Sequence, residues 1–218
     1  MVINPFWYVD QKGFFYRRKK KMKKIGVEYL RDFVEIALFC AIAIVLDRYV
    51  KIPLGATGGS LNLSVVPLFI IALRHGPIKG FIAGGVVYGL ITCLLDGYGM
   101  ACYPLEYLLA FGCVCILGLF ARNINNNFES NKIMPYVFTV LSIVVWSILR
   151  CMFATIDSMI LYEYELVPAL SYNATYVFPS AALDLVIVCA LLPLIVKLNH
   201  KFKTMHLSYS KKEEKEEA

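Results

Sequence analysis

The chain has 218 residues, of which 59% are hydrophobic and 17% charged, with a formal net charge of +6. Soluble domains are about half apolar and about a quarter charged, so this composition, with a mean hydropathy of +0.63, excludes an ordinary soluble domain. Charged residues gather near the two ends, and the apolar region between residues 33 and 198 leaves no room for a separate soluble catalytic domain. The composition therefore indicates an integral membrane protein.

Basic residues form a run near the N-terminus, from Arg17 to Lys24. Because the apolar run that follows continues into a full span, this segment does not have the pattern of a cleavable signal peptide. We expect residues 1–32 to form a basic cytoplasmic segment that contacts anionic lipid headgroups rather than nucleic acid. The sequence permits a translation start at Met1 or at Met22. Residues 199–218 are expected to form a charged cytoplasmic tail.

Apolar runs separated by turn residues predict six transmembrane helices. A spanning helix needs about 20 predominantly apolar residues, and only the second run is short for this. The predicted helices cover about residues 33–50, 61–73, 77–95, 103–121, 134–161 and 172–198. The fold class is therefore an all-α integral membrane protein, with a six-helix membrane domain over residues 33–198.

Basic residues in the connections predict the orientation, because cytoplasmic loops carry an excess of Lys and Arg. Both termini are basic, as are the second-to-third connection, with Arg74 and Lys79, and the fourth-to-fifth, with Arg122. Six spans with both termini cytoplasmic satisfy this pattern, whereas five or seven spans place one basic terminus outside. The first outer connection, residues 52–62, is glycine-rich, and we expect a flexible lid there.

Motifs for several other functions are absent from the sequence. The seven cysteines show no C-x-x-C or Cys/His zinc spacing, so they are interpreted as apolar residues, and no metal or cofactor is predicted. The ATP-binding pattern G-x-x-x-x-G-K-[ST] does not occur. Nor does a membrane-enzyme motif such as D-x-x-D-G or H-E-x-x-H, so no catalytic residue is assigned and no enzymatic activity is expected.

Polar and aromatic side chains gather at the outer ends of the fourth, fifth and sixth predicted helices. They are Tyr103, Glu106, Tyr107, Asp157, Asn173 and Tyr176. Neighbouring helices bring these groups to one depth, and carboxylates beside aromatic rings suit a cationic ligand that also forms hydrogen bonds. The alternative is that tyrosines and carboxylates at helix ends simply lie at the membrane interface.

Two further patterns concern helix packing. Arg150 and Asp184 fall near mid-membrane on consecutive antiparallel helices, which predicts a structural ion pair, with a ligand contact or proton relay as the alternative. Ala37 and Ala41 are one helical turn apart, and small residues so spaced allow another helix to approach closely, either within the protein or from a partner. Gly84 and its neighbours in the third predicted helix show the same pattern.

Three stretches, residues 35–46, 63–76 and 105–112, together resemble the thiamine-specific substrate-binding subunit of energy-coupling factor transporters. The resemblance covers about residues 34–198 and rests on the ordered combination of segments. It implies a six-helix protein that binds thiamine, or a close relative, near the outer face and has no ATPase activity of its own. Transport would need a transmembrane coupling subunit and two cytoplasmic ATPases.

The resemblance also implies roles for particular residues. Ala37 and Ala41 correspond to the face of the first helix that meets the coupling subunit. Glu106 with Tyr107 on the fourth helix, and Asn173 on the sixth, correspond to vitamin-binding residues. The first outer loop corresponds to the gate of the site.

The fifth helix departs from the family pattern. Thiamine-binding members commonly carry His and Trp on this helix and a Trp in the first outer loop, whereas here no His occurs between His75 and His200. Arg150, Asp157 and Tyr162 are the candidates to replace the fifth-helix ligands. A thiamine-precursor pyrimidine is therefore the alternative ligand, and a small membrane enzyme or a self-sufficient carrier is a more distant alternative.

Overall fold

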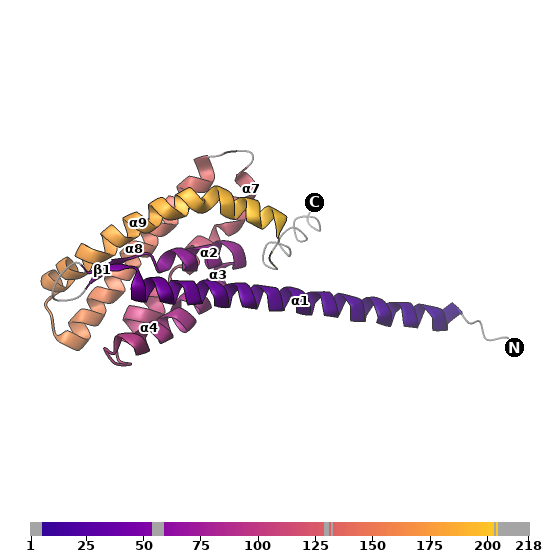
Figure 1. Cartoon of the computed structure of the whole chain (residues 1–218), viewed down its shortest axis with the longest axis horizontal. Helices are drawn as coiled ribbons and strands as arrows, with labels where there is room; N and C mark the ends of the chain where they lie inside the picture. The colour runs from indigo at the N-terminus through magenta and orange to yellow at the C-terminus, as the bar shows by residue number, and fades with distance from the viewer. Residues whose placement is uncertain (1–5, 54–58, 129–130, 132, 203, 205–218) are drawn as a thin grey trace.

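The computed structural model describes residues 6–53, 59–128, 131, 133–202 and 204, with side chains from residue 26 onward except that of Pro53. Helices form a bundle, from which the long helix α1 (Phe6–Tyr49) projects toward the N-terminus (Figure 1). This single helix continues through residue 32, where the sequence predicts the boundary between the basic segment and the membrane domain. The predicted tail beyond residue 204 lies outside the described residues.

Short elements connect the long helices. The elements that follow α1 in chain order are β1 (Lys51–Pro53), β2 (Ser60–Asn62), α2 (Val65–His75), α3 (Pro77–Phe81), the π-helix η1 (Ile82–Tyr88), α4 (Gly89–Asp96), the π-helix η2 (Tyr103–Leu109), α5 (Ala110–Gly112), α6 (Cys115–Leu119), α7 (Ala121–Asn127), α8 (Ile133–Tyr162) and α9 (Leu166–Lys201).

Four helical stretches of the described residues are long and apolar enough to cross a membrane. They are Pro77–Asp96, Tyr103–Asn127, Ile133–Tyr162 and Leu166–Lys201, and they match the third to sixth predicted spans. Large apolar side chains also point outward along these helices, such as Val186 and Leu194 on α9, as a lipid-facing surface requires. The chain is therefore a multi-pass membrane protein.

The first two predicted spans have a different character. The apolar part of α1 contains three charged residues, Glu35, Asp47 and Arg48, and α2 has only 11 residues. All residues of α2 except Ile70 are buried, because α1, α3, α6 and α9 surround it. A helix covered on all sides by protein needs no continuous lipid-facing length, so α2 lies in the core of the bundle.

Glycines allow the helical stretches Pro77–Asp96 and Tyr103–Asn127 to pack at backbone distance. A Cβ atom added to Gly84 would lie 2.6 Å from the carbonyl oxygen of Phe111, and one added to Gly85 would lie 2.5 Å from that of Leu108. Any side chain at these positions would collide with backbone that cannot move aside. The close approach expected from the glycine spacing is confirmed at both positions.

The fold departs from all-α at one hairpin, within the connection expected to be a flexible lid. β1 pairs antiparallel with β2, with Lys51 opposite Asn62 and Pro53 opposite Ser60. The Ser180 hydroxyl of α9 donates to the Ser60 carbonyl at 3.3 Å, which fixes the hairpin against the bundle. Residues 54–58, where the rest of the predicted lid falls, lie outside the described residues.

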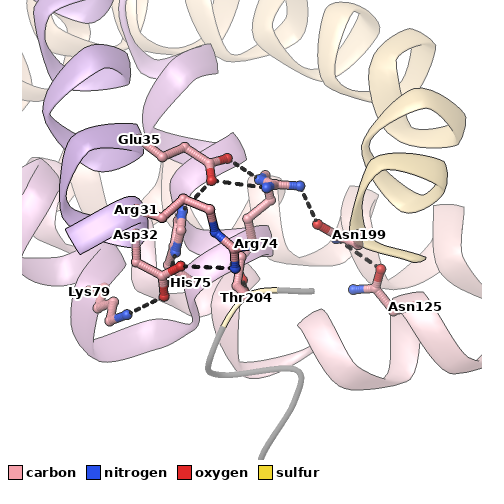
Figure 2. A network of polar contacts seen from close by, with 9 residues as sticks. All are labelled: Arg31, Asp32, Glu35, Arg74, His75, Lys79, Asn125, Asn199 and Thr204. Carbon is pink, nitrogen blue, oxygen red and sulfur yellow. Dashed lines mark hydrogen bonds and ion pairs between the residues drawn. The ribbon is translucent and has the colours of Figure 1, made fainter. Parts of the chain in front are cut away.

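A polar network joins the helices at the end of the bundle away from this hairpin (Figure 2). The guanidinium of Arg74, at the C-terminus of α2, donates to both carboxylate oxygens of Glu35 on α1 and, at 2.8 Å, to Asn199 on α9. Asn199 in turn donates to Asn125 of α7 at 2.9 Å. The Thr204 hydroxyl donates to the Arg74 carbonyl.

The same network continues to the start of α3. Lys79 donates to Asp32 of α1 at 2.9 Å, and the His75 ring lies 3.5 Å from Asp32 and 3.6 Å from Glu35. From the sequence, Arg74 and Lys79 are interpreted only as basic residues of a cytoplasmic connection, which indicate the topology. The structure adds that they link α1 to α2, α3 and α9, because isolated charges at this depth would be costly.

Candidate functional site

A cavity of about 610 Å³ lies beside the hairpin. Its lining comes from the hairpin, the ends of α1 and α4, η2 and α5, the second half of α8 and the start of α9. Such a volume is typical of sites for small molecules. The lining residues are Asp47, Lys51, Gly59, Ser60, Asn62, Asp96, Tyr98, Cys102, Glu106, Tyr107, Phe111, Arg150, Asp157, Ser158, Tyr162, Tyr164, Pro168, Tyr172, Asn173 and Tyr176.

Carboxylates and aromatic rings dominate this lining. It contains four acidic side chains against two basic ones, and six tyrosines with one phenylalanine. An excess of carboxylates inside a membrane protein favours a cationic ligand, and aromatic faces attract cations through the ring quadrupole. The arrangement is therefore chemically suited to a small aromatic or aliphatic cation that can also form hydrogen bonds.

The π-helix η2 places Glu106 and Tyr107 on the cavity. The wider turn of a π-helix changes the direction of successive side chains and is frequent at functional sites. Glu106 lies within electrostatic range of Arg150 and Asp157, and beside the Tyr176 hydroxyl. The Tyr107 hydroxyl donates to Asp96 at 2.8 Å. Glu106 is thus the carboxylate toward which groups from α8 and α9 converge.

Asn173 joins α8 and α9 at the wall of the cavity. Its amide nitrogen donates to the Ser158 hydroxyl at 3.1 Å and to the Ala169 carbonyl at 3.0 Å, while its oxygen accepts from Tyr176 at 2.6 Å. These bonds fix the orientation of a side chain that is only 1% exposed. The remaining lone pair of the amide oxygen can accept one more hydrogen bond.

Gly59, directly before β2, lines the cavity and allows the hairpin to approach Tyr176 closely. Gly59 has a φ of +77°, and a Cβ added there would lie 2.8 Å from the Tyr176 ring. Only glycine accepts this conformation and this approach without strain. Tyr176 is therefore placed between the hairpin and Asn173.

A charged cluster borders the same end of the cavity. Arg48 at the end of α1 donates to Asp96 of α4 at 2.6 Å and lies 3.4 Å from Asp47. Asn62 of β2 donates to Asp47 at 3.1 Å. The cluster joins α1, α4 and the hairpin, and two of its carboxylates line the cavity. Sequence reasoning did not single out Asp47 or Asp96, which are separate in sequence and close to helix ends.

The structure brings together five of the six residues predicted for binding. Glu106, Tyr107, Asp157, Asn173 and Tyr176 all line the cavity, as does Tyr162, one of the candidates for the fifth helix.

Tyr103 has a different place. It is not among the residues that line the cavity, and its hydroxyl donates to the Gly85 carbonyl at 3.3 Å, so it connects η2 to η1. The small residues predicted for a helix contact, Ala37 and Ala41, are exposed on the surface of α1.

Arg150 and Asp184 do not form the direct ion pair that the sequence predicts. No salt bridge joins them in the part of the chain that the structure describes, and neither carboxylate oxygen of Asp184 has a hydrogen-bond partner. The Arg150 guanidinium lies instead over the Phe111 ring, 4.6 Å from its centroid, where it lines the cavity. Asp184 stays within electrostatic range of Arg150 without touching it.

The chain is similar to several known proteins. The sequence profile of the thiamine transporter protein family (Thia_YuaJ) matches residues 33–203. The thiamine transporter ThiT of Bacillus subtilis is 29% identical over 175 residues, which cover 72% of this chain and 88% of the relative. A UPF0397 protein of Lacticaseibacillus casei is 29% identical over 126 residues, 55% of this chain and 66% of the relative.

A solved structure supports the same fold. ThiT from Listeria monocytogenes superposes with a TM-score of 0.67 at 20% sequence identity, covering 77% of this chain and 98% of that chain. The helical bundle and its cavity define a multi-pass membrane protein with a cavity of the size of a small molecule. Since the family profile covers most of the chain, the protein belongs to the thiamine transporter family, which confirms the resemblance seen in the sequence. The Bacillus subtilis relative is named a transporter, in keeping with a transport rather than an enzymatic function.

Proposed function

We propose that this protein is the substrate-binding subunit of an energy-coupling factor importer and that it captures thiamine, or a close relative, from the outer side of the cell membrane. The observation that carries the proposal is the cavity beside the hairpin, where Glu106 lies among tyrosines and an excess of carboxylates. Membership of the thiamine transporter family supports the same ligand.

Thiamine has the chemistry that this lining favours. Its thiazolium ring is a permanent cation, which the carboxylates balance and the tyrosine rings attract. Its aminopyrimidine ring carries an amino group that can donate a hydrogen bond to the Glu106 carboxylate. A charge-assisted hydrogen bond of this kind is stronger than a neutral one. Asn173 and Tyr176 supply further hydrogen-bonding groups from α9.

A thiamine-precursor pyrimidine is the second candidate ligand. The observation that favours it is the position of Trp146, the one tryptophan on α8: its side chain is fully buried and its indole nitrogen donates to the Ala110 carbonyl at 3.1 Å. Trp146 therefore does not offer the cavity an aromatic face in place of the tryptophans that thiamine-binding members carry.

The proposed topology has six membrane helices, with α1 and α2 as the first two and both termini cytoplasmic. In this orientation the cavity opens outward and the network around Arg74 lies at the cytoplasmic end. The exposed positions of Ala37 and Ala41 on α1 support a coupling subunit at this face, because small residues permit close helix contact. Two cytoplasmic ATPases would supply the energy.

Reconstitution in liposomes tests the assignment. We expect radiolabelled thiamine to bind to the protein alone, with uptake only when a coupling subunit, both ATPases and ATP are present. Uptake by the protein alone would support a self-sufficient carrier and contradict the proposal.

A further inference from the structure

Arg150 occupies an unusual position among the cavity residues. It lies on α8, twelve residues before the C-terminal end of the helix at Tyr162, and is 8% exposed. Its guanidinium carbon is 4.6 Å from the centroid of Phe111 and 5.3 Å from that of Trp146. The two rings hold a planar cation in a fixed orientation on the wall of the cavity.

The guanidinium has no hydrogen-bond acceptor in the described part of the protein. Its Nη1 atom is fully buried without a partner, and no salt bridge includes Arg150. Arg74, the other deeply buried arginine, shows the usual solution, with donors directed to Glu35 and Asn199. The protein can therefore saturate a buried arginine, and at Arg150 it does not.

An unsatisfied buried donor is costly, and a charged one inside a membrane protein more so. Glu106 and Asp184 compensate the charge of Arg150 at a distance, but they leave its Nη1 donor without a partner. Because Arg150 lines the cavity and keeps 8% of its surface exposed, a bound ligand can supply an acceptor to its guanidinium.

The spacing along α8 indicates how such a ligand would lie. Arg150 and Asp157 are seven residues apart and both line the cavity, so they share one face of the helix. Seven residues correspond to about 10 Å along the axis. The site thus presents a cation at its inner end and carboxylates nearer the hairpin.

We propose that Arg150 forms a subsite at the inner end of the cavity, which donates hydrogen bonds to an electron-rich accepting group of the ligand while the rest of the ligand extends toward Glu106 and Asp157. This inference rests on the proposed function for the identity of the ligand. The accepting group is either a nitrogen or hydroxyl oxygen of thiamine itself or a phosphate oxygen of a phosphorylated thiamine. Both sources share the same chemistry at Arg150.

The test compares thiamine and thiamine monophosphate by titration calorimetry on the purified full chain. Arg150→Met should weaken binding by tenfold to a hundredfold, as expected for the loss of one charge-assisted hydrogen bond. Equal losses for both ligands would assign the acceptor to thiamine itself, and a larger loss for the monophosphate would assign it to the phosphate. Arg150→Lys keeps the charge without the planar fork and should restore binding only in part.

Two variants control for folding and for charge. Arg150→Met with Asp184→Asn removes both charges, so it should melt close to the parent protein while still binding weakly. Arg122→Met changes an exposed arginine of α7 outside the cavity and should bind as the parent does. If folded Arg150→Met binds both ligands as tightly as the parent, the Arg150 subsite is contradicted and the proposed function is unaffected. If the parent binds neither ligand, the proposed function fails and the subsite fails with it.

Discussion

The polar side chains of the cavity differ in how far hydrogen bonds within the protein already use their donors and acceptors. Asn173 uses both amide hydrogens on Ser158 and Ala169, and Tyr107 donates its proton to Asp96. Glu106, in contrast, meets α8 and α9 mainly through electrostatic interactions. Its carboxylate is therefore the group of this set best placed to accept hydrogen bonds from a cationic ligand.

Replacing Glu106 with glutamine tests this role. The variant keeps the shape of the side chain but removes its charge, which contributes about 1.5–3 kcal/mol in a charge-assisted hydrogen bond. Glu106→Gln should thus weaken thiamine binding by about tenfold to a hundredfold in titration calorimetry. Glu163→Gln, an exposed position between α8 and α9 outside the cavity, is the matched control and should bind normally. If both variants bind thiamine as tightly as the parent, the carboxylate of Glu106 does not contribute to binding.

At the residue level, the sequence singles out polar groups that stand out against an apolar helix. Glu106, Asp157 and Asn173 are conspicuous for this reason, and all three line the cavity. Asp47 and Asp96 are not conspicuous, because charges near helix ends are ordinary. The depth of Arg150 and Asp184 is apparent from the sequence, but the rotation of their helices is not, so the cation–π contact of Arg150 with Phe111 was not foreseen.

At the scale of the elements, the close contact of η1 with η2 depends on glycine, which has no side chain. Gly85 faces the carbonyl of Leu108 so closely that a Cβ would lie 2.5 Å from it. Gly85→Ala should therefore lower the melting temperature in detergent by several degrees, since overpacking costs about 1–3 kcal/mol. Gly26→Ala, in a part of α1 with nothing within 4 Å, should leave it unchanged or raise it slightly. A Gly85→Ala protein as stable as the parent would show that the two elements can separate.

The outer surface of α1 provides a second test at this scale. Leucine at both Ala37 and Ala41 should abolish coupled uptake while thiamine binding stays intact, because bulky side chains prevent close approach of a partner helix. Leu38→Phe, which enlarges an exposed neighbour on α1, should transport normally. Binding and uptake are measured on the same reconstituted preparations. Loss of binding in the double variant would mean that this face supports the bundle itself.

Element boundaries follow well from apolar runs but not from local backbone detail. The predicted helices over residues 77–95 and 134–161 end within one residue of the observed Pro77–Asp96 and Ile133–Tyr162. The hairpin was missed because its strands have three residues each, too few for a period to appear. The π-helices were missed because one extra residue in a turn leaves no pattern in an apolar segment.

Across the whole molecule, polar residues are divided between two ends. The cavity and its acidic lining lie beside the hairpin. The network around Arg74, which Figure 2 shows, lies at the other end of the bundle. In the proposed topology, which follows the positive-inside rule, the second end is the cytoplasmic one. The separation would allow a ligand to be captured on one side while partners act on the other.

Labelling of single cysteines tests this orientation. In a protein whose seven native cysteines are replaced, Glu163→Cys between α8 and α9 should react with a membrane-impermeant thiol reagent in intact cells. Arg122→Cys on α7 should react only after the membrane is made permeable. The two residues are exposed in the structure, so access to the thiol depends on the side of the membrane. The reverse pattern would overturn the proposed topology.

The most direct test of the central claim is a calorimetric titration of thiamine into the purified protein, without coupling or ATPase subunits. The carboxylate-rich, tyrosine-lined cavity predicts saturable binding of one thiamine per chain. The pyrimidine half of thiamine should bind more weakly, since it lacks the cationic ring. The absence of saturable binding for both compounds would contradict the assignment of this cavity to thiamine capture.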